Sequence, residues 1–176
     1  YYNTDAANIR NKPETGGGAL MDIGCYCISF PRFIFGRGPE RVTALINIDP
    51  QFKTDNLTSG LLDFGDGLSA TFTCSTRLEP CQRVNIMGEK GRLEVEVPVN
   101  APAGQPCRLW LQQEKNIQEI TIAPANQYTL QADEFSKAIL YNTPVPTPLT
   151  DALGNMQVID ALFASARQHG WVTVGA

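Results

Sequence analysis

The residues with the clearest chemical potential in this 176-residue chain are an acid and a phenol four positions apart, Asp22 and Tyr26. They lie in a glycine-rich apolar stretch, residues 16–26, which reads GGGALMDIGCY. An α-helix has about 3.6 residues per turn, so side chains at positions i and i+4 lie one above the other. A phenol ordinarily titrates near pH ~10 and needs help to exchange protons near neutrality. The pair therefore predicts a site for general acid–base chemistry.

The element that must position this pair is a helix, which we expect over residues 19–35. Its apolar side chains recur at steps of three and four residues, which is typical of a buried helical stripe. The members of this stripe are Leu20, Ile23, Cys27, Phe30 and Ile34. Asp22 and Tyr26 fall beside the stripe, at the border between core and solvent where a cleft wall would be. Pro31 is expected to kink or end the helix, because it offers no N–H to the preceding turn.

Spacing alone also allows a purely structural interpretation of Asp22 and Tyr26. An acid in the first turn is stabilised by the helix dipole, and a tyrosine at the edge of a core is common. The glycines of residues 16–18 lack the spacing of a dinucleotide-binding fingerprint, so we interpret them as a helix start that allows close backbone approach. Arg10 and Lys12, just upstream, could reach the same cleft and bind substrate, or could lie in a solvated loop.

The rest of the chain is expected to form a strand-rich middle followed by two helices. Alternating apolar and polar residues, with glycine-rich turns, predict strands and hairpins. The expected strands cover residues 41–49, 57–64, 68–76, 82–87, 92–97, 107–112 and 117–122, with a closing strand near 172–174. Helices are expected over residues 130–141 and after an N-cap at Thr150. Such a block of strands with helices on either side predicts an α+β sheet covered on one face.

Composition argues against several classes of function. The net charge is −4 and the charges are interspersed, so we expect no nucleic-acid surface. No apolar run approaches the roughly 20 residues of a membrane span and no signal peptide opens the chain, so we expect a cytoplasmic protein without membrane contact. The five cysteines form no C-x-x-C motif and should be free thiols, and one histidine, His169, makes no metal site. Asn56-Leu57-Thr58 is formally a glycosylation sequon, but the cysteine usage argues against a secreted protein.

Three segments resemble one family of enzymes. The run ETGGGALMDIGCYCISFPRFIFGRGPERV is similar to the signature that opens the C-terminal domain of the Gfo/Idh/MocA oxidoreductases. That signature has a Gly-Gly pair, an Asp, a Gly, and a His or Tyr four residues after the Asp, here Gly17, Gly18, Asp22, Gly24 and Tyr26. VNIMGEKGRLEV resembles the family's hairpin, and PTPLTDALGNMQVIDALFASARQHG its final helix. Tyrosine in the last position is closer to the glucose–fructose oxidoreductase and dihydrodiol dehydrogenase branches.

The resemblance implies a fold and an activity. The fold would be an open-faced, largely antiparallel β-sheet with helices packed on one face, and the uncovered face would pack against another subunit in a homodimer or homotetramer. The activity would be hydride transfer between NAD or NADP and the hydroxyl-bearing carbon of a sugar, polyol or dihydrodiol. Tyr26 would be the general acid/base, and Asp22 would orient it or bind substrate. Gly17 and Gly18 would lie close to the cofactor.

Other parts of the family's pattern are missing from this sequence. It contains no G-x-G-x-x-G after a strand, no Glu-Lys-Pro segment for the family's catalytic lysine, and no initiator methionine. We therefore expect residues 1–176 to be a C-terminal substrate-binding and oligomerisation domain that lacks its N-terminal Rossmann domain and is inactive alone. Two alternatives stay open: a non-catalytic binding or dimerisation module, and a nicotinamide-dependent glycosidase of the same fold.

Overall fold

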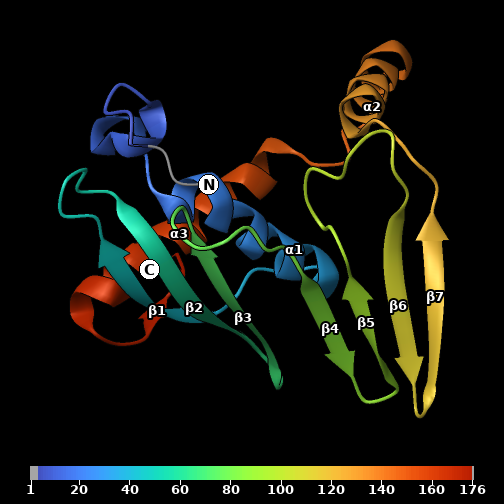
Figure 1. Cartoon of the computed structure of the whole chain (residues 1–176), viewed down its shortest axis with the longest axis horizontal. Helices are drawn as coiled ribbons and strands as arrows, with labels where there is room; N and C mark the ends of the chain where they lie inside the picture. Colours follow the sequence, from blue (N-terminus) through green and yellow to red (C-terminus); the bar gives the residue numbers. More distant parts are fainter. Residues whose placement is uncertain (1–3, 176) are drawn as a thin grey trace. The chain divides into compact units, whose positions relative to one another are not determined.

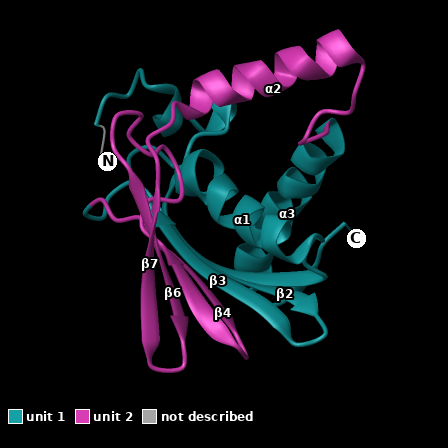
Figure 2. Cartoon of the chain, turned by 90° about the vertical axis from the view of Figure 1, so that its right-hand side faces the viewer, with its two compact units in different colours: residues 1–79, 149–176 teal, residues 80–148 magenta. Residues whose placement is uncertain are grey.

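The computed structural model describes residues 4–175 and divides the chain into two compact units (Figure 2). The first unit joins residues 1–79 to residues 149–176, and the second is residues 80–148. The first contains 3-10 turns at Ile9–Asn11 and Pro13–Thr15, a π-helical turn (Leu20–Gly24), α1 (Cys25–Phe35), β1 (Arg41–Ile48), β2 (Asp55–Gly65), β3 (Leu68–Ser75), α3 (Leu149–Gln168) and β8 (Val172–Thr173) (Figure 1). The second contains β4 (Val84–Gly88), β5 (Gly91–Val95), β6 (Cys107–Gln113), β7 (Asn116–Ile122) and α2 (Gln127–Tyr141).

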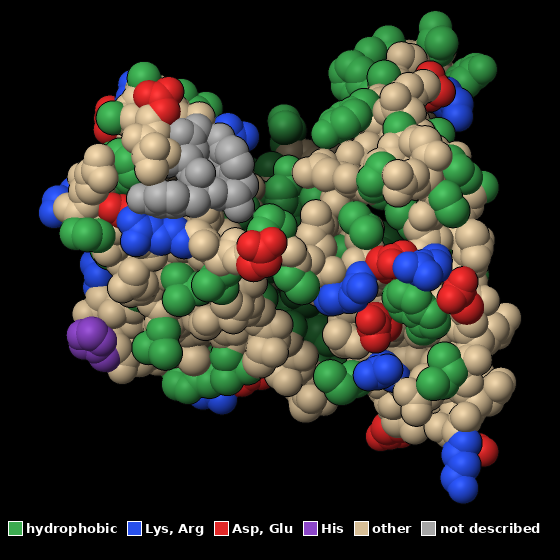
Figure 3. Space-filling model, viewed as in Figure 1, with side chains coloured by type: hydrophobic (Ala, Val, Ile, Leu, Met, Phe, Trp, Pro, Cys, Tyr) green, Lys and Arg blue, Asp and Glu red, His purple; other side chains and the backbone are tan. Residues whose placement is uncertain are grey.

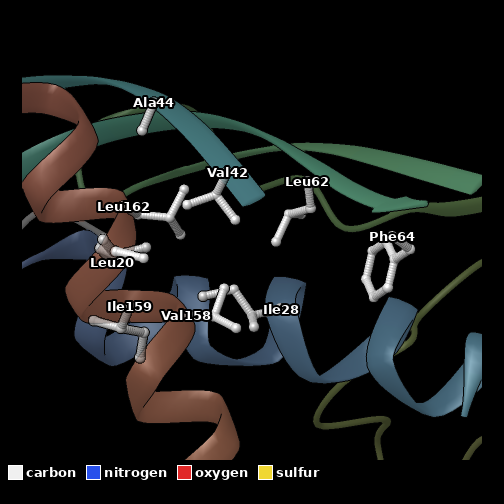
Figure 4. Packing of buried hydrophobic residues seen from close by; sticks show 10 residues of the cluster. Leu20, Ile28, Val42, Ala44, Leu62, Phe64, Val158, Ile159 and Leu162 are labelled. Carbon is white, nitrogen blue, oxygen red and sulfur yellow. The ribbon is translucent and has the colours of Figure 1, made fainter. Parts of the chain in front are cut away.

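The first unit is a sheet with two helices on one face. Its strands run antiparallel in the order β3-β2-β1-β8. Alternate residues of a strand point to the same face, so β1 and β2 each present a row of apolar side chains to α1 and α3. The buried cluster between these layers includes Leu20, Ile28, Val42, Leu62, Phe64, Val158, Ile159 and Leu162 (Figure 4). Burial of this cluster joins the helix that carries Tyr26 to the sheet.

The opposite face of this sheet is open within the first unit. Strand register places Leu45 of β1 opposite Ser59 of β2, and Ser59 opposite Thr73 of β3. Leu45 is 79% exposed, and the hydroxyls of Ser59 and Thr73 bond to each other at 2.8 Å. Among the described residues of the unit, no helix covers these side chains. The result is a polar surface with a large exposed apolar side chain in it.

The second unit is an antiparallel sheet, β4-β5-β6-β7, followed by α2. Charged side chains gather over its strands (Figure 3). The Arg108 and Arg83 guanidinium groups lie 5.3 and 5.8 Å from the centre of the Trp110 ring, and Arg108 also pairs with Glu96. The α2 helix begins where the side chain of Asn126 accepts the backbone N–H groups of two following residues. Several of its apolar side chains are exposed, among them Leu130, Phe135 and Ile139.

The α+β class is confirmed, with antiparallel strands and helices packed on one face of the first sheet. Within residues 4–175 the strands form two four-stranded sheets. Every expected strand is present, and each of its ends lies within two residues of the expected position. The expected N-cap at Thr150 is wrong: α3 begins at Leu149, so Thr150 lies inside the helix. An N-cap residue lies just before the first helical residue, but Leu149, which precedes Thr150, is already helical. The apolar periodicity of a sequence does not fix a helix end to within one residue.

The helix expected over residues 19–35 is present, but it turns a different set of residues toward the core than expected. A π-helical turn, Leu20–Gly24, precedes α1. Bonds from i to i+5 take more residues per turn than α-helical bonds, so the π turn rotates every later residue around the axis. The buried positions are therefore Leu20, Gly24 and Ile28, and the expected positions Ile23, Cys27, Phe30 and Ile34 are only partly buried or exposed.

Pro31 does not end the helix, which continues to Phe35. Contacts from outside the helix hold its last turns in place. Arg32 forms an ion pair with Asp151 of α3 at 3.0 Å, and the Phe35 ring meets the Phe64 ring edge-on with centroids 4.8 Å apart. Tertiary packing thus offsets the hydrogen bond that the proline removes.

One segment, Pro13–Phe35, reaches the length and mean hydropathy of a membrane span, 23 residues and 1.2. The expectation that no run approaches this length was wrong, because it counted uninterrupted apolar residues, whereas average hydropathy tolerates Asp22 and Arg32 within the segment. A core helix and a signal sequence satisfy the same criterion; in this segment Leu20 and Ile28 are buried against the sheet, whereas Phe33 and Ile34 are exposed.

The cysteines are free thiols, as expected. Cys74 is buried and Cys81 is exposed. Burial raises the pKa of the Cys27 thiol to about 11, and it also raises the pKa of Cys74. The Asn56 side chain of the formal sequon is buried in β2, where it accepts a hydrogen bond from Asn47 at 2.7 Å. Among the described residues, no group of His, Cys, Asp and Glu could hold a metal ion.

These environments predict selective thiol labelling. At pH ~8 a thiol with a pKa near 11 is about one-thousandth thiolate, and only the thiolate reacts. Iodoacetamide should therefore modify Cys81 of the native protein quickly and leave Cys27 and Cys74 unmodified, as read by peptide mass spectrometry. In urea all three should react. Labelling of native Cys74 at the rate of Cys81 would contradict the packing described here.

Candidate functional site

The glycine-rich loop packs its backbone where a side chain has no room. A Cβ atom on Gly18 would lie 2.0 Å from Asp55 Oδ1, and one on Gly17 would lie 2.5 Å from the Arg10 carbonyl oxygen. Gly18 also has a φ of 118°, which other residues rarely adopt. The N–H of Gly17 donates to the Lys12 carbonyl at 3.0 Å, and that of Gly18 to the Arg10 carbonyl at 2.9 Å. The loop therefore fixes Arg10 and Lys12 beside the start of the helix.

A buried carboxylate from the sheet caps that helix start. Asp55, the first residue of β2, is 2% exposed. Its Oδ2 accepts the backbone N–H of Leu20 and the hydroxyl of Thr58, both at 2.8 Å. Burial raises the pKa of the Asp55 carboxyl, although these two hydrogen bonds oppose the shift. The cap ties the first free N–H groups of the helix to the sheet.

A second buried carboxylate holds the loop that leads to Asp55. Asp49 accepts the N–H groups of Gln51 and Phe52 at 2.8 and 3.2 Å, and pairs with Arg77 at 2.5 Å. Burial alone would raise the pKa of the Asp49 carboxyl, but these N–H groups and the guanidinium hold it below its ordinary value. The loop between β1 and β2 is thereby closed on itself, and Asp55 enters β2 in a defined position.

Asp22 lies in the π-helical turn and is bound by Arg10. Both oxygens of its carboxylate accept from Arg10 Nε at 2.9 Å. The structure therefore joins two of the residues that the sequence singled out, across the glycine loop. Lys12 contributes its carbonyl oxygen to the loop and forms no ion pair within residues 4–175. A guanidinium is a stronger partner for a carboxylate than a phenol is.

Tyr26 lies at the start of α1 and is 45% exposed. Its side chain makes no hydrogen bond within the described part of the chain, with Asp22 or with any other residue. The π turn displaces Tyr26 from the position directly above Asp22 that an α-helix would give. The expected contact between acid and phenol is therefore replaced by an Arg10–Asp22 pair with an accessible phenol one turn further along.

Comparison with known proteins decides the family. Residues 1–94 match the model of the GFO/IDH/MocA C-terminal domain. The chain belongs to the GFO/IDH/MocA family. Over 177 residues it is 38% identical to an uncharacterized oxidoreductase of Rhizobium meliloti, covering 98% of this chain and 53% of that protein. It is 27% identical to D-xylose 1-dehydrogenase (NADP+) 2 of Haloferax volcanii, covering 92% of this chain and 49% of that one.

The fold of this GFO/IDH/MocA domain is shared with solved structures. Aldose-aldose oxidoreductase from Caulobacter crescentus, in complex with glycerol, superimposes with a TM-score of 0.88 and 26% identity, covering 98% of this chain and 52% of that one. The chain spans about half the length of the curated relatives it matches.

The residues of the GFO/IDH/MocA signature thus lie close together, and each has a different structural role. Its glycines form the loop, its Asp22 holds Arg10, and its tyrosine is accessible. Sequence reasoning missed Asp55, which lies 35 residues beyond Leu20 and whose side chain completes the helix start. No local pattern marks it, because Asp at the beginning of a strand resembles any turn residue.

Gly18 should tolerate no side chain. Alanine there would combine an unfavourable φ with a clash against Asp55, so Gly18→Ala should lower the free energy of unfolding by roughly 3 kcal/mol. Gly38→Ala is the control, since a Cβ there meets nothing within 4 Å, and should change stability by less than about 1 kcal/mol. Urea unfolding of both variants measures the difference. Equal stability of the two would show that the loop rearranges freely.

Proposed function

We propose that this chain is the substrate-side part of an oxidoreductase that transfers hydride between NAD or NADP and the hydroxyl-bearing carbon of a sugar, polyol or dihydrodiol, with Tyr26 as general acid/base. The observation that carries the proposal is the accessible phenol of Tyr26, one turn beyond the Arg10–Asp22 pair on a helix whose start is fixed by Asp55. The oxidoreductase relatives of this family supply the reaction class.

Oxidation of an alcohol requires that the hydroxyl proton leave while the carbon loses hydride. The deprotonated oxygen of Tyr26 accepts that proton, and in the reverse direction its phenol returns one to the carbonyl oxygen. A bound nicotinamide supplies the hydride acceptor or donor. Tyr26 must therefore face the substrate, which fits its 45% exposure and the lack of a side-chain partner within residues 4–175.

Arg10 and Asp22 bind and orient the substrate in this proposal. Asp22 engages Nε of Arg10, so the remaining guanidinium N–H groups, which have no partner among the described residues, are free to donate to substrate hydroxyls. The pairing also holds the guanidinium in one orientation before substrate binds, which lowers the entropy cost of binding. Lys12, on the same loop, is a second candidate for contacting substrate.

Gly17 and Gly18 have an indirect role toward the cofactor in this proposal. The space beside them is filled by the Arg10 carbonyl and by Asp55, and Gly18 is buried. Their N–H groups already donate to Lys12 and Arg10, so these glycines keep the loop compact near the cofactor and donate no hydrogen bond to it. We assign the main contacts with NAD or NADP to the part of the relatives that this chain does not span.

Replacing Tyr26 tests the proposal. In the full-length protein, Tyr26→Phe should lower kcat by about 10²-fold or more, because it removes the group that moves the proton. Turnover is measured with D-xylose, glycerol and a trans-dihydrodiol, each with NAD+ and NADP+. Tyr141→Phe is the control, since Tyr141 is exposed on α2 in the other unit. Unchanged turnover in Tyr26→Phe would remove Tyr26 from the mechanism.

The open face of the β3-β2-β1-β8 sheet is proposed as the contact between copies of this chain in a homodimer or homotetramer. Hydroxyl side chains and the 79% exposed Leu45 make this face able to pack against a matching one. Leu45→Glu would place a charge in that contact and should convert the full-length protein to monomers in light scattering. Leu68→Glu, at the end of β3, is the control. An assembly unchanged by Leu45→Glu would rule out this face.

A further inference from the structure

A side chain of α3 holds the helix backbone directly beside Tyr26. Asn155 donates from Nδ2 to the carbonyl oxygen of Cys25 at 3.1 Å. Its Oδ1 accepts from Arg32 Nη1 at 3.2 Å. Arg32 in turn pairs through Nη2 with Asp151 Oδ1 at 3.0 Å. One amide therefore connects α3 to two points of α1, and a salt bridge between the same helices fixes the amide.

The neighbouring glycine makes room for this arrangement. A Cβ on Gly154 would lie 2.6 Å from Arg32 Nη2. Without it, the guanidinium lies against α3, where its side chain is only 12% exposed. Hydrogen bonds in such a poorly hydrated place are stronger than at the surface, and losing one leaves a polar group unsatisfied.

The carbonyl group to which Asn155 donates lies directly before Tyr26 in the backbone. The Cys25 carbonyl belongs to the peptide group that joins Cys25 to Tyr26, so its orientation sets the position of the Tyr26 backbone. This peptide also lies where the π-helical turn changes to α1, a point at which the helix's own bonding pattern is interrupted. Tyr26 is half-exposed and its side chain has no hydrogen-bond partner within residues 4–175. Its placement therefore depends on the backbone.

We propose that Asn155, fixed by Arg32 and Asp151, is a positioning residue for Tyr26. The inference rests on the proposed function, since it gives Asn155 an effect on turnover through Tyr26. A displacement of a reacting group by about 1 Å can cost about 10²-fold in rate. Asn155→Asp keeps the shape of the side chain but replaces the donor to Cys25 with an oxygen that repels that carbonyl.

A double-mutant cycle in the full-length protein tests this role. The cycle compares wild type, Asn155→Asp, Tyr26→Phe and the double variant, using the most active of D-xylose, glycerol and a trans-dihydrodiol with NAD+ or NADP+. Asn155→Asp should lower kcat by about tenfold, with KM changed by less than about twofold. In the Tyr26→Phe background the same change should lower kcat by less than about twofold, because the group it positions is gone. Gln157→Glu, the same amide-to-carboxylate change at an exposed position of α3, should have no effect in either background.

The outcomes separate the two proposals. Equal losses from Asn155→Asp in both backgrounds would mean a general structural role and would overturn the positioning role alone. Unchanged turnover in Tyr26→Phe would overturn the proposed function, and the inference with it. If Asn155→Asp does not fold, Asp151→Asn replaces it in the cycle. That half-exposed residue should give a loss of about threefold that also disappears in the Tyr26→Phe background, and a loss that persists there would overturn the inference.

Discussion

Burying a carboxylate costs free energy unless N–H and O–H groups donate hydrogen bonds to it. In this structure a buried carboxylate, that of Asp55, lies at the start of the helix that carries the signature residues. Asp55 is buried and accepts from Leu20 and Thr58. Because Gly18 has no side chain, the backbone comes close enough to the carboxylate for this cap to form. The helix start is thereby fixed relative to the sheet, and the positions of Asp22 and Tyr26 along the helix follow from it.

Three consecutive segments of the chain carry the residues of the candidate site. The loop before the helix carries Arg10 and is held by the N–H groups of two glycines. The π-helical turn presents Asp22 to that arginine. The α1 helix presents Tyr26 and is bonded from α3 through Asn155. Asp22 is thus held by an ion pair with Arg10, and Tyr26 is held through the backbone that carries it.

Two surfaces expose apolar side chains that nothing covers among the described residues of their own unit. The sheet of the first unit exposes Leu45 among hydroxyl side chains, and α2 of the second unit exposes Leu130, Phe135 and Ile139. Proteins rarely leave such groups in water without a reason. The chain spans about half the length of its curated relatives, and the oxidoreductase that we propose would include contacts that this chain alone does not display.

The amino-acid sequence alone was enough to predict the family, the α+β class and nearly every strand and helix, because these depend on local periodicity, turn residues and a compact motif. It also placed Gly17, Gly18, Asp22 and Tyr26 in one region. It could not determine that a π turn shifts the buried face, or that the helix continues through Pro31. Nor could it determine that Asp22 pairs with Arg10 and not with Tyr26. Those outcomes depend on partners far away in the chain, such as Asp55 and Asn155, and long-range contacts leave no periodic trace in the sequence. Only the tertiary structure brings these side chains together, and their hydrogen bonds decide which local conformation is the stable one.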